Sequence, residues 1–412
     1  MRNLIMCLNL AAVLTYGAER VTLTGKVTDN LGKPIEDATV MVYHAGVKVG
    51  YSAYCPSCYV DCGKRTVTDG TGSFTIKSLA PDLWFELLVV RDGYTPTFIK
   101  KVDPSRGPAE TAALSRRGVV DDPDRVVRGR VVDSSGQPVR AAVVEADGIY
   151  APPADSLWYG TIEGLEPVAV TNPKGEFELA YSKKATGMVL RVEARTMATK
   201  VVAAPTGAER TTITVSEGAL VRGRLLNHGK PVAGAELGLI PRNTGGFSSK
   251  FKISGDPYSE IRIGTQDDGS FVITNVPAPV GWYIYGKMES IAALGATDHM
   301  KCATVRDGEE VDVGDIEIHP GHRLRGKVTL SDGNSVADGM RVTVTSENGT
   351  GDSQTVLIGP DGHFEFVSLP TGDYQIFASV RGYKSGANQD AATTVDRDID
   401  NFTIKLDRMV RR

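Results

Sequence analysis

The chain has 412 residues, of which 41% are hydrophobic and 23% charged, so it is long enough for several globular domains. Its net charge is -4, and it has no basic stripe that could neutralise a run of phosphates, so we expect no nucleic-acid partner. The 45 glycines and 21 prolines suit many short strands joined by turns.

The N-terminus has the pattern of a secretory signal peptide. Arg2 supplies a positive charge, and the apolar stretch that ends at Leu14 is too short to span a bilayer. The small residues Gly17 and Ala18 allow cleavage at this point. We therefore expect residues 1–18 to be removed and the mature protein, without a membrane span, to be secreted, periplasmic or on the cell surface. Disulfides persist in such compartments. The alternative is a buried first strand.

Four segments of the remaining chain begin alike. They open with LTGKVTDNLGKPIEDATVMV, VRGRVVDSSGQPVRAAVVEA, VRGRLLNHGKPVAGAELGL and LRGKVTLSDGNSVADGMRVTV. The opening glycines are Gly25, Gly129, Gly223 and Gly326. A Gly-x-Phe step follows in each segment, at Gly72/Phe74, Gly175/Phe177, Gly269/Phe271 and Gly362/Phe364. The segments recur about every 100 residues, so each is a whole domain and not a solenoid repeat.

The pattern within each segment predicts β-strands. VRGRVV and FTIKSL alternate polar and apolar residues, as half-buried strands do, and clusters with Asp-Gly mark the turns between them. An aromatic-rich strand follows the Gly-x-Phe step, and we expect Trp84, Trp282 and Tyr374 at matching core positions in it. About seven short strands in roughly 90 residues indicate a small β-sandwich.

The order of these landmarks resembles the carboxypeptidase regulatory-like domain. The resemblance is strong in the first two segments, where Pro34 and Pro138 occupy the expected turn. It is fair in the third, with Pro231, and weaker in the fourth, where Val336 stands in the proline region. The resemblance implies a transthyretin-like (prealbumin-like) sandwich that is also grouped with starch-binding-like folds. In metallocarboxypeptidases such a domain accompanies a catalytic domain and is not itself catalytic.

We therefore expect an all-β protein of four tandem, seven-stranded, Greek-key-type sandwich domains. The expected domains are residues 20–115, 125–216, 219–318 and 322–408. Bacterial tandem forms of the family look like cell-surface or periplasmic binding and spacer modules, although fold alone does not fix function.

Three cysteines lie close together in YCPSCYVDCGK, which resembles C-x3-C-G-K segments of some bacterial members. We predict a disulfide between Cys58 and Cys62 that fixes the shape of a long loop. Cys55 and Cys302 lie in different domains and either pair or stay reduced. One alternative is a zinc site in which His44 joins Cys55, Cys58 and Cys62. A redox Cys-x-x-Cys is another, although its α/β context is missing.

The sequence predicts no catalytic site, no metal and no cofactor. It has six histidines but no zinc-peptidase motif, no nucleophile elbow and no phosphate loop. His319 and His322 could share a metal, but we interpret their segment as a polar linker between the third and fourth domains.

Two further patterns have simpler structural interpretations. The segment DRDIDNFTIKLD imitates a calcium loop, but it lacks the glycine and the bidentate glutamate, and FTIKL alternates like a closing strand. Lys26 and Lys327 sit on opening strands, where an isopeptide cross-link is conceivable. Because Lys327 falls on the face opposite Leu324 and Val328, we expect it to point outward, away from any buried partner.

Aromatic residues gather in the longer middle segments of the first three domains, at about residues 46–66, 147–168 and 241–263. We single out Tyr54, Tyr59, Trp158 and Tyr159 as ligand-binding candidates, because such side chains can stack on a sugar or grip a peptide. The alternative is that they fold back and cover the sheet.

These observations predict a non-catalytic binding or spacer protein of the cell envelope, with carbohydrate or an envelope protein as partner. Two other functions remain open. The chain could be a purely structural spacer, or its domains could assist a separate peptidase.

Overall fold

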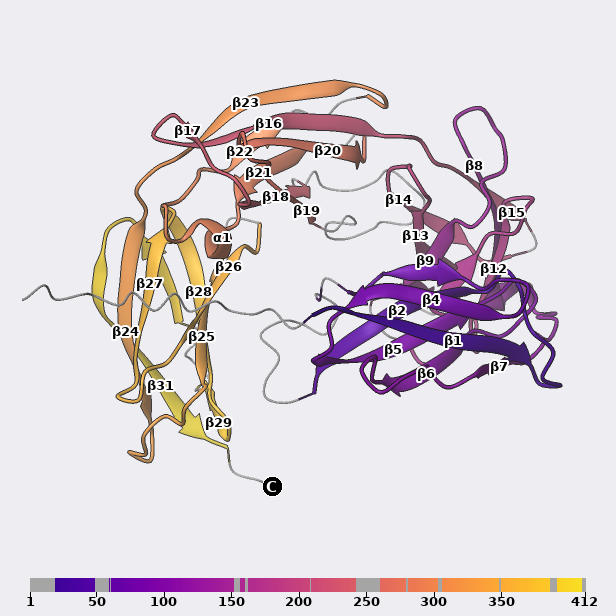
Figure 1. Cartoon of the computed structure of the whole chain (residues 1–412), viewed down its shortest axis with the longest axis horizontal. Helices are drawn as coiled ribbons and strands as arrows, with labels where there is room; N and C mark the ends of the chain where they lie inside the picture. Colours follow the sequence, from indigo (N-terminus) through magenta and orange to yellow (C-terminus); the bar gives the residue numbers. More distant parts are fainter. Residues whose placement is uncertain are drawn as a thin grey trace, which may run out of the picture. The chain divides into compact units, whose positions relative to one another are not determined.

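A computed structural model describes residues 19–48, 59, 61–151, 156–159, 162–207, 209–241, 260–278, 281–302, 306–347, 350–385 and 391–409. The expected all-β sandwich fold is confirmed, since these residues form strands with only two short helical turns (Figure 1). The chain divides into two compact units, Met1–Asp121 with Val168–Val170, and Asp122–Pro167 with Thr171–Arg412. Within the described residues, no helix is long and apolar enough to cross a membrane. The signal peptide expected at residues 1–18 lies outside them.

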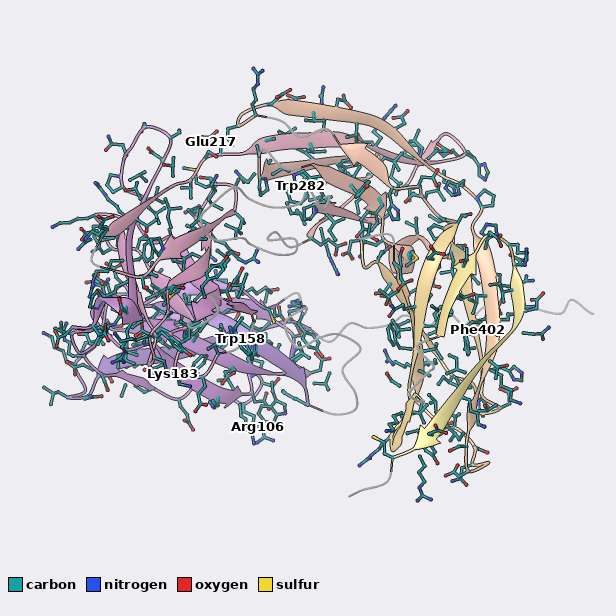
Figure 2. All side chains as sticks on the ribbon, turned by 180° about the vertical axis from the view of Figure 1, so that it is seen from behind. Arg106, Trp158, Lys183, Glu217, Trp282 and Phe402 are labelled. Atoms are coloured by element: carbon teal, nitrogen blue, oxygen red, sulfur yellow. The ribbon has the colours of Figure 1, made fainter. Side chains whose placement is uncertain are left out.

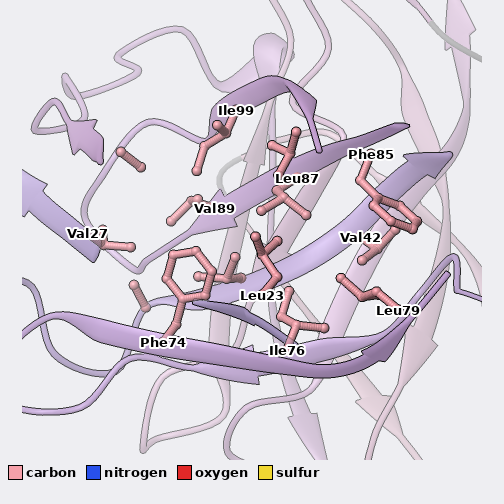
Figure 3. Packing of buried hydrophobic residues seen from close by; sticks show 14 of the residues in the cluster. Leu23, Val27, Val42, Phe74, Ile76, Leu79, Phe85, Leu87, Val89 and Ile99 are labelled. Carbon is pink, nitrogen blue, oxygen red and sulfur yellow. The ribbon is translucent and has the colours of Figure 1, made fainter. Parts of the chain in front are cut away.

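We call the four expected domains repeats 1 to 4. In repeat 1 (residues 20–115) one sheet has the order β4 (Ser73–Leu79), β1 (Val21–Asp29), β7 (Ala112–Leu114). The other has the order β3 (Arg65–Val67), β2 (Thr39–Val47), β5 (Leu83–Val90), β6 (Thr97–Val102). The core lies between the two sheets and contains the side chains labelled in Figure 3, among them Leu23, Phe74 and Phe85.

Repeat 2 (residues 125–216) follows a 3₁₀ turn, η2 (Pro123–Arg125). One sheet has the order β12 (Glu176–Ala180), β8 (Val126–Val132), β15 (Arg210–Thr214). The other has the order β10 (Ser156–Tyr159), β9 (Val143–Ala151), β13 (Gly187–Glu193), β14 (Lys200–Pro205). The short strand β11 (Val168–Val170) lies between β10 and β12 in the chain.

Repeat 3 (residues 219–318) has the same plan. One sheet has the order β17 (Lys230–Pro231), β16 (Ala219–Asn227), β20 (Ser270–Val276), and β23 (Glu310–Ile318) also pairs with β16. The other has the order β19 (Ile261–Gly264), β18 (Glu236–Pro241), β21 (Trp282–Gly286), β22 (Met300–Cys302). A short helix, α1 (Met288–Ile291), separates β21 from β22.

Repeat 4 (residues 322–408) completes the series. One sheet has the order β27 (His363–Leu369), β24 (His322–Leu330), β31 (Ile399–Arg408), β29 (Tyr383–Ser385). The other has the order β26 (Ser353–Leu357), β25 (Arg341–Ser346), β28 (Gly372–Ser379), β30 (Ala391–Val395).

The opening glycine and the Gly-x-Phe phenylalanine of each repeat are partners across two strands. Gly129 on β8 lies opposite Phe177 on β12, and the same register pairs Gly25 with Phe74. A Cβ atom on Gly129 would lie 2.4 Å from Cζ of Phe177, because the ring lies across the glycine. The corresponding pairs in repeats 3 and 4 are Gly223 with Phe271 and Gly326 with Phe364. Both landmarks therefore belong to one packing arrangement that the four repeats share.

The first and last strands of every repeat run parallel. The pairs are β1 with β7, β8 with β15, β16 with β23 and β24 with β31. The other pairings that involve these strands are antiparallel, as a Greek-key sandwich requires. In the part of the chain that the structure describes, the four repeats thus share this placement of the first strand, and repeats 2, 3 and 4 each have one strand more than the expected seven, which repeat 1 has.

Repeats 2, 3 and 4 are joined through buried side chains. Tyr150, Val189 and Val201 of repeat 2 belong to the same hydrophobic cluster as the core of repeat 3. The Nδ2 atom of Asn275 in repeat 3 donates to the carbonyl oxygens of Thr196 and Glu217, at 2.8 Å each. The joint between repeats 3 and 4 differs. There Met288, the first residue of α1 in repeat 3, belongs to the hydrophobic core of repeat 4.

Candidate functional site

Trp158 is the candidate aromatic residue that the structure exposes. Its side chain is 61% exposed, and it lies on β10, an edge strand of repeat 2 (Figure 2). Trp158 lies opposite the buried Ile149 on β9, so these two side chains are on the same face of the sheet. The neighbouring Leu157 lies on the opposite face and packs against the shared core of repeats 2 and 3. A large apolar side chain beside a free strand edge can accept a ligand that stacks on its ring.

Tyr59 is the other aromatic candidate whose side chain the structure describes. Tyr59 is partly buried and packs against the core of repeat 1, so it covers the sheet in the way that the alternative hypothesis predicts. Tyr159 follows Trp158 on β10, opposite Gly148. Tyr54 lies outside the described residues.

One aromatic prediction was wrong by a single position. Trp282 and Tyr374 are fully buried as expected, but Trp84 is only half-buried. Trp84 follows the buried Leu83, and a shift of one residue along a strand moves a side chain to the other face. Its ring lies on the outer side, where the Nζ of Lys48 is 5.6 Å from the ring centroid.

The cysteine prediction is not tested. Cys55 and Cys58 lie outside the described residues, so the Cys58–Cys62 disulfide and the zinc alternative both stay predictions. Cys62 is half-buried against the core of repeat 1. His44, the fourth zinc ligand of that alternative, lies on β2 with its Nδ1 atom 3.4 Å from Oε2 of Glu86.

The histidines and aspartates that the sequence suggested as metal ligands make hydrogen bonds and ion pairs with protein groups. The Nε2 atom of His319 lies 3.3 Å from Oδ1 of Asp298, whereas Nε2 of His322 lies 3.0 Å from Oγ1 of Thr371. In the segment that imitates a calcium loop, Asp398 Oδ1 accepts a 2.9 Å hydrogen bond from the backbone N–H of Arg323. The described part of the chain contains no cluster of histidine, cysteine and carboxylate side chains that could hold a metal ion. The segment forms β31, the closing strand that its alternation predicts.

Lys26 and Lys327 are exposed, as expected for side chains that face away from the core. Leu324 and Val328 on the other face of β24 are buried.

A buried threonine is a feature that the sequence reasoning missed. Thr68 Oγ1 donates to the carbonyl oxygen of Ile35 at 2.7 Å and accepts from the backbone N–H of Ala38 at 2.9 Å. Thr171 and Thr265 make the same pair of contacts in repeats 2 and 3. The signal was available, because each threonine stands just before the turn that leads to the Gly-x-Phe step.

A buried group of interacting charges that the sequence did not predict lies at the joint between repeats 3 and 4. Lys287 and Asp352 are 8% and 1% exposed. The Nζ of Lys287 lies 2.6 Å from Oδ1 of Asp352 and 2.9 Å from Oε1 of Glu260. The hydroxyl of Tyr285 also donates to Glu260, and Nε of Arg262 donates to its other oxygen at 2.7 Å. We call Lys287, Asp352 and Glu260 the joint cluster.

The joint cluster is electrostatically balanced. Burial raises the pKa of Glu260, but the Lys287 ammonium and the hydrogen bonds from Lys287, Tyr285 and Arg262 outweigh burial, so this pKa lies below its usual value. Burial, together with the Glu260 and Asp352 carboxylates, raises the pKa of Tyr285, which therefore keeps its proton. The Lys287 ammonium thus lies between the carboxylates of Glu260 and Asp352, and all three side chains are largely buried.

Glu145 on β9 has the most strongly shifted carboxyl pKa of repeat 2. Burial and, to a smaller extent, the carboxylates of Asp147 and Glu193 raise this pKa to about 7 against the opposing effect of Arg191. A shifted carboxyl is a common feature of catalytic acids. The charged groups that shift this one are Asp147 on the same strand and Arg191 and Glu193 on the neighbouring β13.

Comparison with known proteins identifies two of the repeats. Residues 22–115 and 323–407 match the model of the carboxypeptidase regulatory-like domain. These ranges correspond to repeats 1 and 4, so the expectation that the resemblance is strong in repeat 2 and weakest in repeat 4 was wrong. No curated protein sequence matches the chain.

Similar solved structures include three bacterial pilins. A streptococcal ancillary pilin is 12% identical at a TM-score of 0.23, covering 69% of this chain and 100% of its own. A minor pilin of Streptococcus agalactiae is 14% identical at a TM-score of 0.24, covering 47% and 98%. A shaft pilin of Lactobacillus rhamnosus GG is 11% identical at a TM-score of 0.20, covering 47% and 99%.

Proposed function

Because the chain carries carboxypeptidase regulatory-like domains at residues 22–115 and 323–407, we propose that it is an exported, non-catalytic spacer of the cell envelope built from four such repeats. The spacer role rests on one observation. Buried side chains continue across both joints of repeats 2, 3 and 4, whereas flexible linkers would leave each repeat with a core of its own.

A spacer of this kind holds its repeats at fixed separations. Attaching spin labels through bioorthogonal side chains at Lys183 in repeat 2 and Lys405 in repeat 4 makes this separation measurable, because both positions are exposed. We expect a narrow distance distribution in electron double resonance. Labels at the exposed Leu357 and Lys405, which lie on the two different sheets of repeat 4, give the spread that the labels themselves cause. A distribution much broader than this control would contradict the spacer role.

The exposed Trp158 supports a second function, the binding of carbohydrate or of a protein partner at β10. In its favour, this ring is 61% exposed on an edge strand, whereas Trp282 is fully buried. Tyr159 follows Trp158 on the same strand. Tyr54 and Tyr59 are the corresponding candidates of repeat 1, where the packing of Tyr59 against the core argues against that residue.

For this second function we expect Trp158→Ala to abolish binding on a glycan array, since aromatic stacking would supply most of the affinity. Phe377→Ala is a matched control, because Phe377 is also exposed, at 40%, but lies on repeat 4. Binding that survives Trp158→Ala, or wild-type protein that binds no glycan and no envelope protein, would exclude this site.

A further inference from the structure

Lys287 has contacts that set it apart from the other paired lysines of the described chain. Lys48 and Lys64 each have one aspartate partner, and the remaining hydrogen bond of each amine goes to a backbone carbonyl oxygen. Lys184 contacts two aspartates, but its side chain is 63% exposed. Lys287 combines two carboxylate partners with a side chain that is only 10% exposed.

Asp352 is held in a fixed orientation against this amine. Its Oδ2 atom accepts a 2.9 Å hydrogen bond from the backbone N–H of Met288, and its Oδ1 atom accepts one of 3.0 Å from the N–H of Ser353. Negative charge that develops on Oδ2 during an attack on the carboxyl carbon would therefore meet a fixed donor. The Lys287 amine is already within hydrogen-bond distance of the same carboxyl group, which is the proximity that an intramolecular reaction needs.

We propose that Lys287 and Asp352 condense into an amide bond that links repeat 3 covalently to repeat 4. The Nζ atom attacks the Asp352 carboxyl carbon, an N–C bond forms, and the bond between that carbon and Oδ1 breaks. The ammonium gives up two protons, and with Oδ1 they leave as one water molecule. Glu260 accepts a proton from Nζ and passes it to the departing oxygen, so it is unchanged at the end. No oxidant, reductant or other reactant is consumed.

Burial favours this reaction in two ways. A buried ion pair pays a desolvation cost that a neutral amide avoids. The site also excludes bulk water, which opposes hydrolysis of the product. Among the described residues, the amine of Lys48 in repeat 1 contacts the Asp103 carboxylate and no second carboxylate, so we expect this ionic contact to remain unlinked. This proposal does not depend on the spacer role. It concerns a covalent bond between Lys287 and Asp352, whereas the spacer role concerns the distance between repeats.

Intact-mass spectrometry of the fully reduced, denatured full-length protein tests the proposal. We expect a deficit of one water molecule relative to the sequence, and peptide mapping should find the peptides of Lys287 and Asp352 joined. Lys287→Arg should restore the full mass, and Glu260→Gln should reduce the linked fraction. Lys48→Arg is the matched control and should keep the deficit.

Full mass for the wild-type protein, with the two peptides separate, would overturn the proposal and leave an ionic contact. A deficit that mapping assigns to another pair of residues would overturn it equally. The wild-type measurement decides the matter even if a variant does not fold.

Discussion

Gly175→Ala is expected to lower the free energy of unfolding of repeat 2 by about 3 to 5 kcal/mol. Gly175 has a φ of +75°, a conformation that costs alanine free energy whatever space surrounds it. In addition, its Cβ atom would lie 2.4 Å from the carbonyl oxygen of Val131. That oxygen accepts a hydrogen bond from Val139, so the backbone cannot move away without loss. Urea denaturation followed by circular dichroism measures the change.

Gly136→Ala separates the two causes. Gly136 has a similar φ of +82°, but a Cβ atom there would meet nothing within 4 Å. We expect this variant to lose only about 1 kcal/mol, the conformational part of the cost. Equal losses for the two variants would show that the contact with Val131 has no energetic weight.

Lys287→Met is expected to destabilise the joint between repeats 3 and 4 by about 3 to 5 kcal/mol. The substitution removes the cation and leaves the Asp352 carboxylate, 1% exposed, without its ion-pair partner. The direction holds whether the pair is ionic or has condensed to an amide. Calorimetry of the full-length protein should resolve an earlier transition for repeat 4 in the variant.

Two further variants test the cause. Lys184 also contacts two aspartates, Asp122 and Asp124, but its side chain is 63% exposed, so Lys184→Met should destabilise the protein far less than Lys287→Met does. Combining Lys287→Met with Asp352→Asn removes the stranded charge and should recover part of the loss. A Lys184 variant as damaging as the Lys287 variant would show that burial is not the reason.

The fold could be predicted from the sequence because its signals are local and repeated. Gly129 and Phe177 mark the two strands that pair, and the same marks recur in every repeat. The placement of Trp84 could not be predicted as safely, because strand register must be known to a single residue before a face can be assigned. Leu83, not Trp84, takes the core position.

The joint cluster could not be predicted for a different reason. Glu260 and Lys287 come from separate segments of repeat 3, and Asp352 joins them only because repeat 4 docks on repeat 3. Each looks like an ordinary surface residue in the sequence. By contrast, Thr68 and its equivalents Thr171 and Thr265 recur at one position and could have been recognised as a structural contact.

The first and last strands of each repeat are parallel neighbours, and this pairing determines how the repeat responds to a force that pulls on its two ends. When two neighbouring parallel strands are pulled from the start of one and the end of the other, their hydrogen bonds are loaded together in shear, whereas a hairpin pulled at its open end unzips bond by bond. The β1–β7 ladder pairs residues 27–29 with 112–114, but the β24–β31 ladder extends from Leu324 to Leu330. Under a pulling force, repeat 1 would therefore extend before repeat 4, and the chain would lengthen in steps.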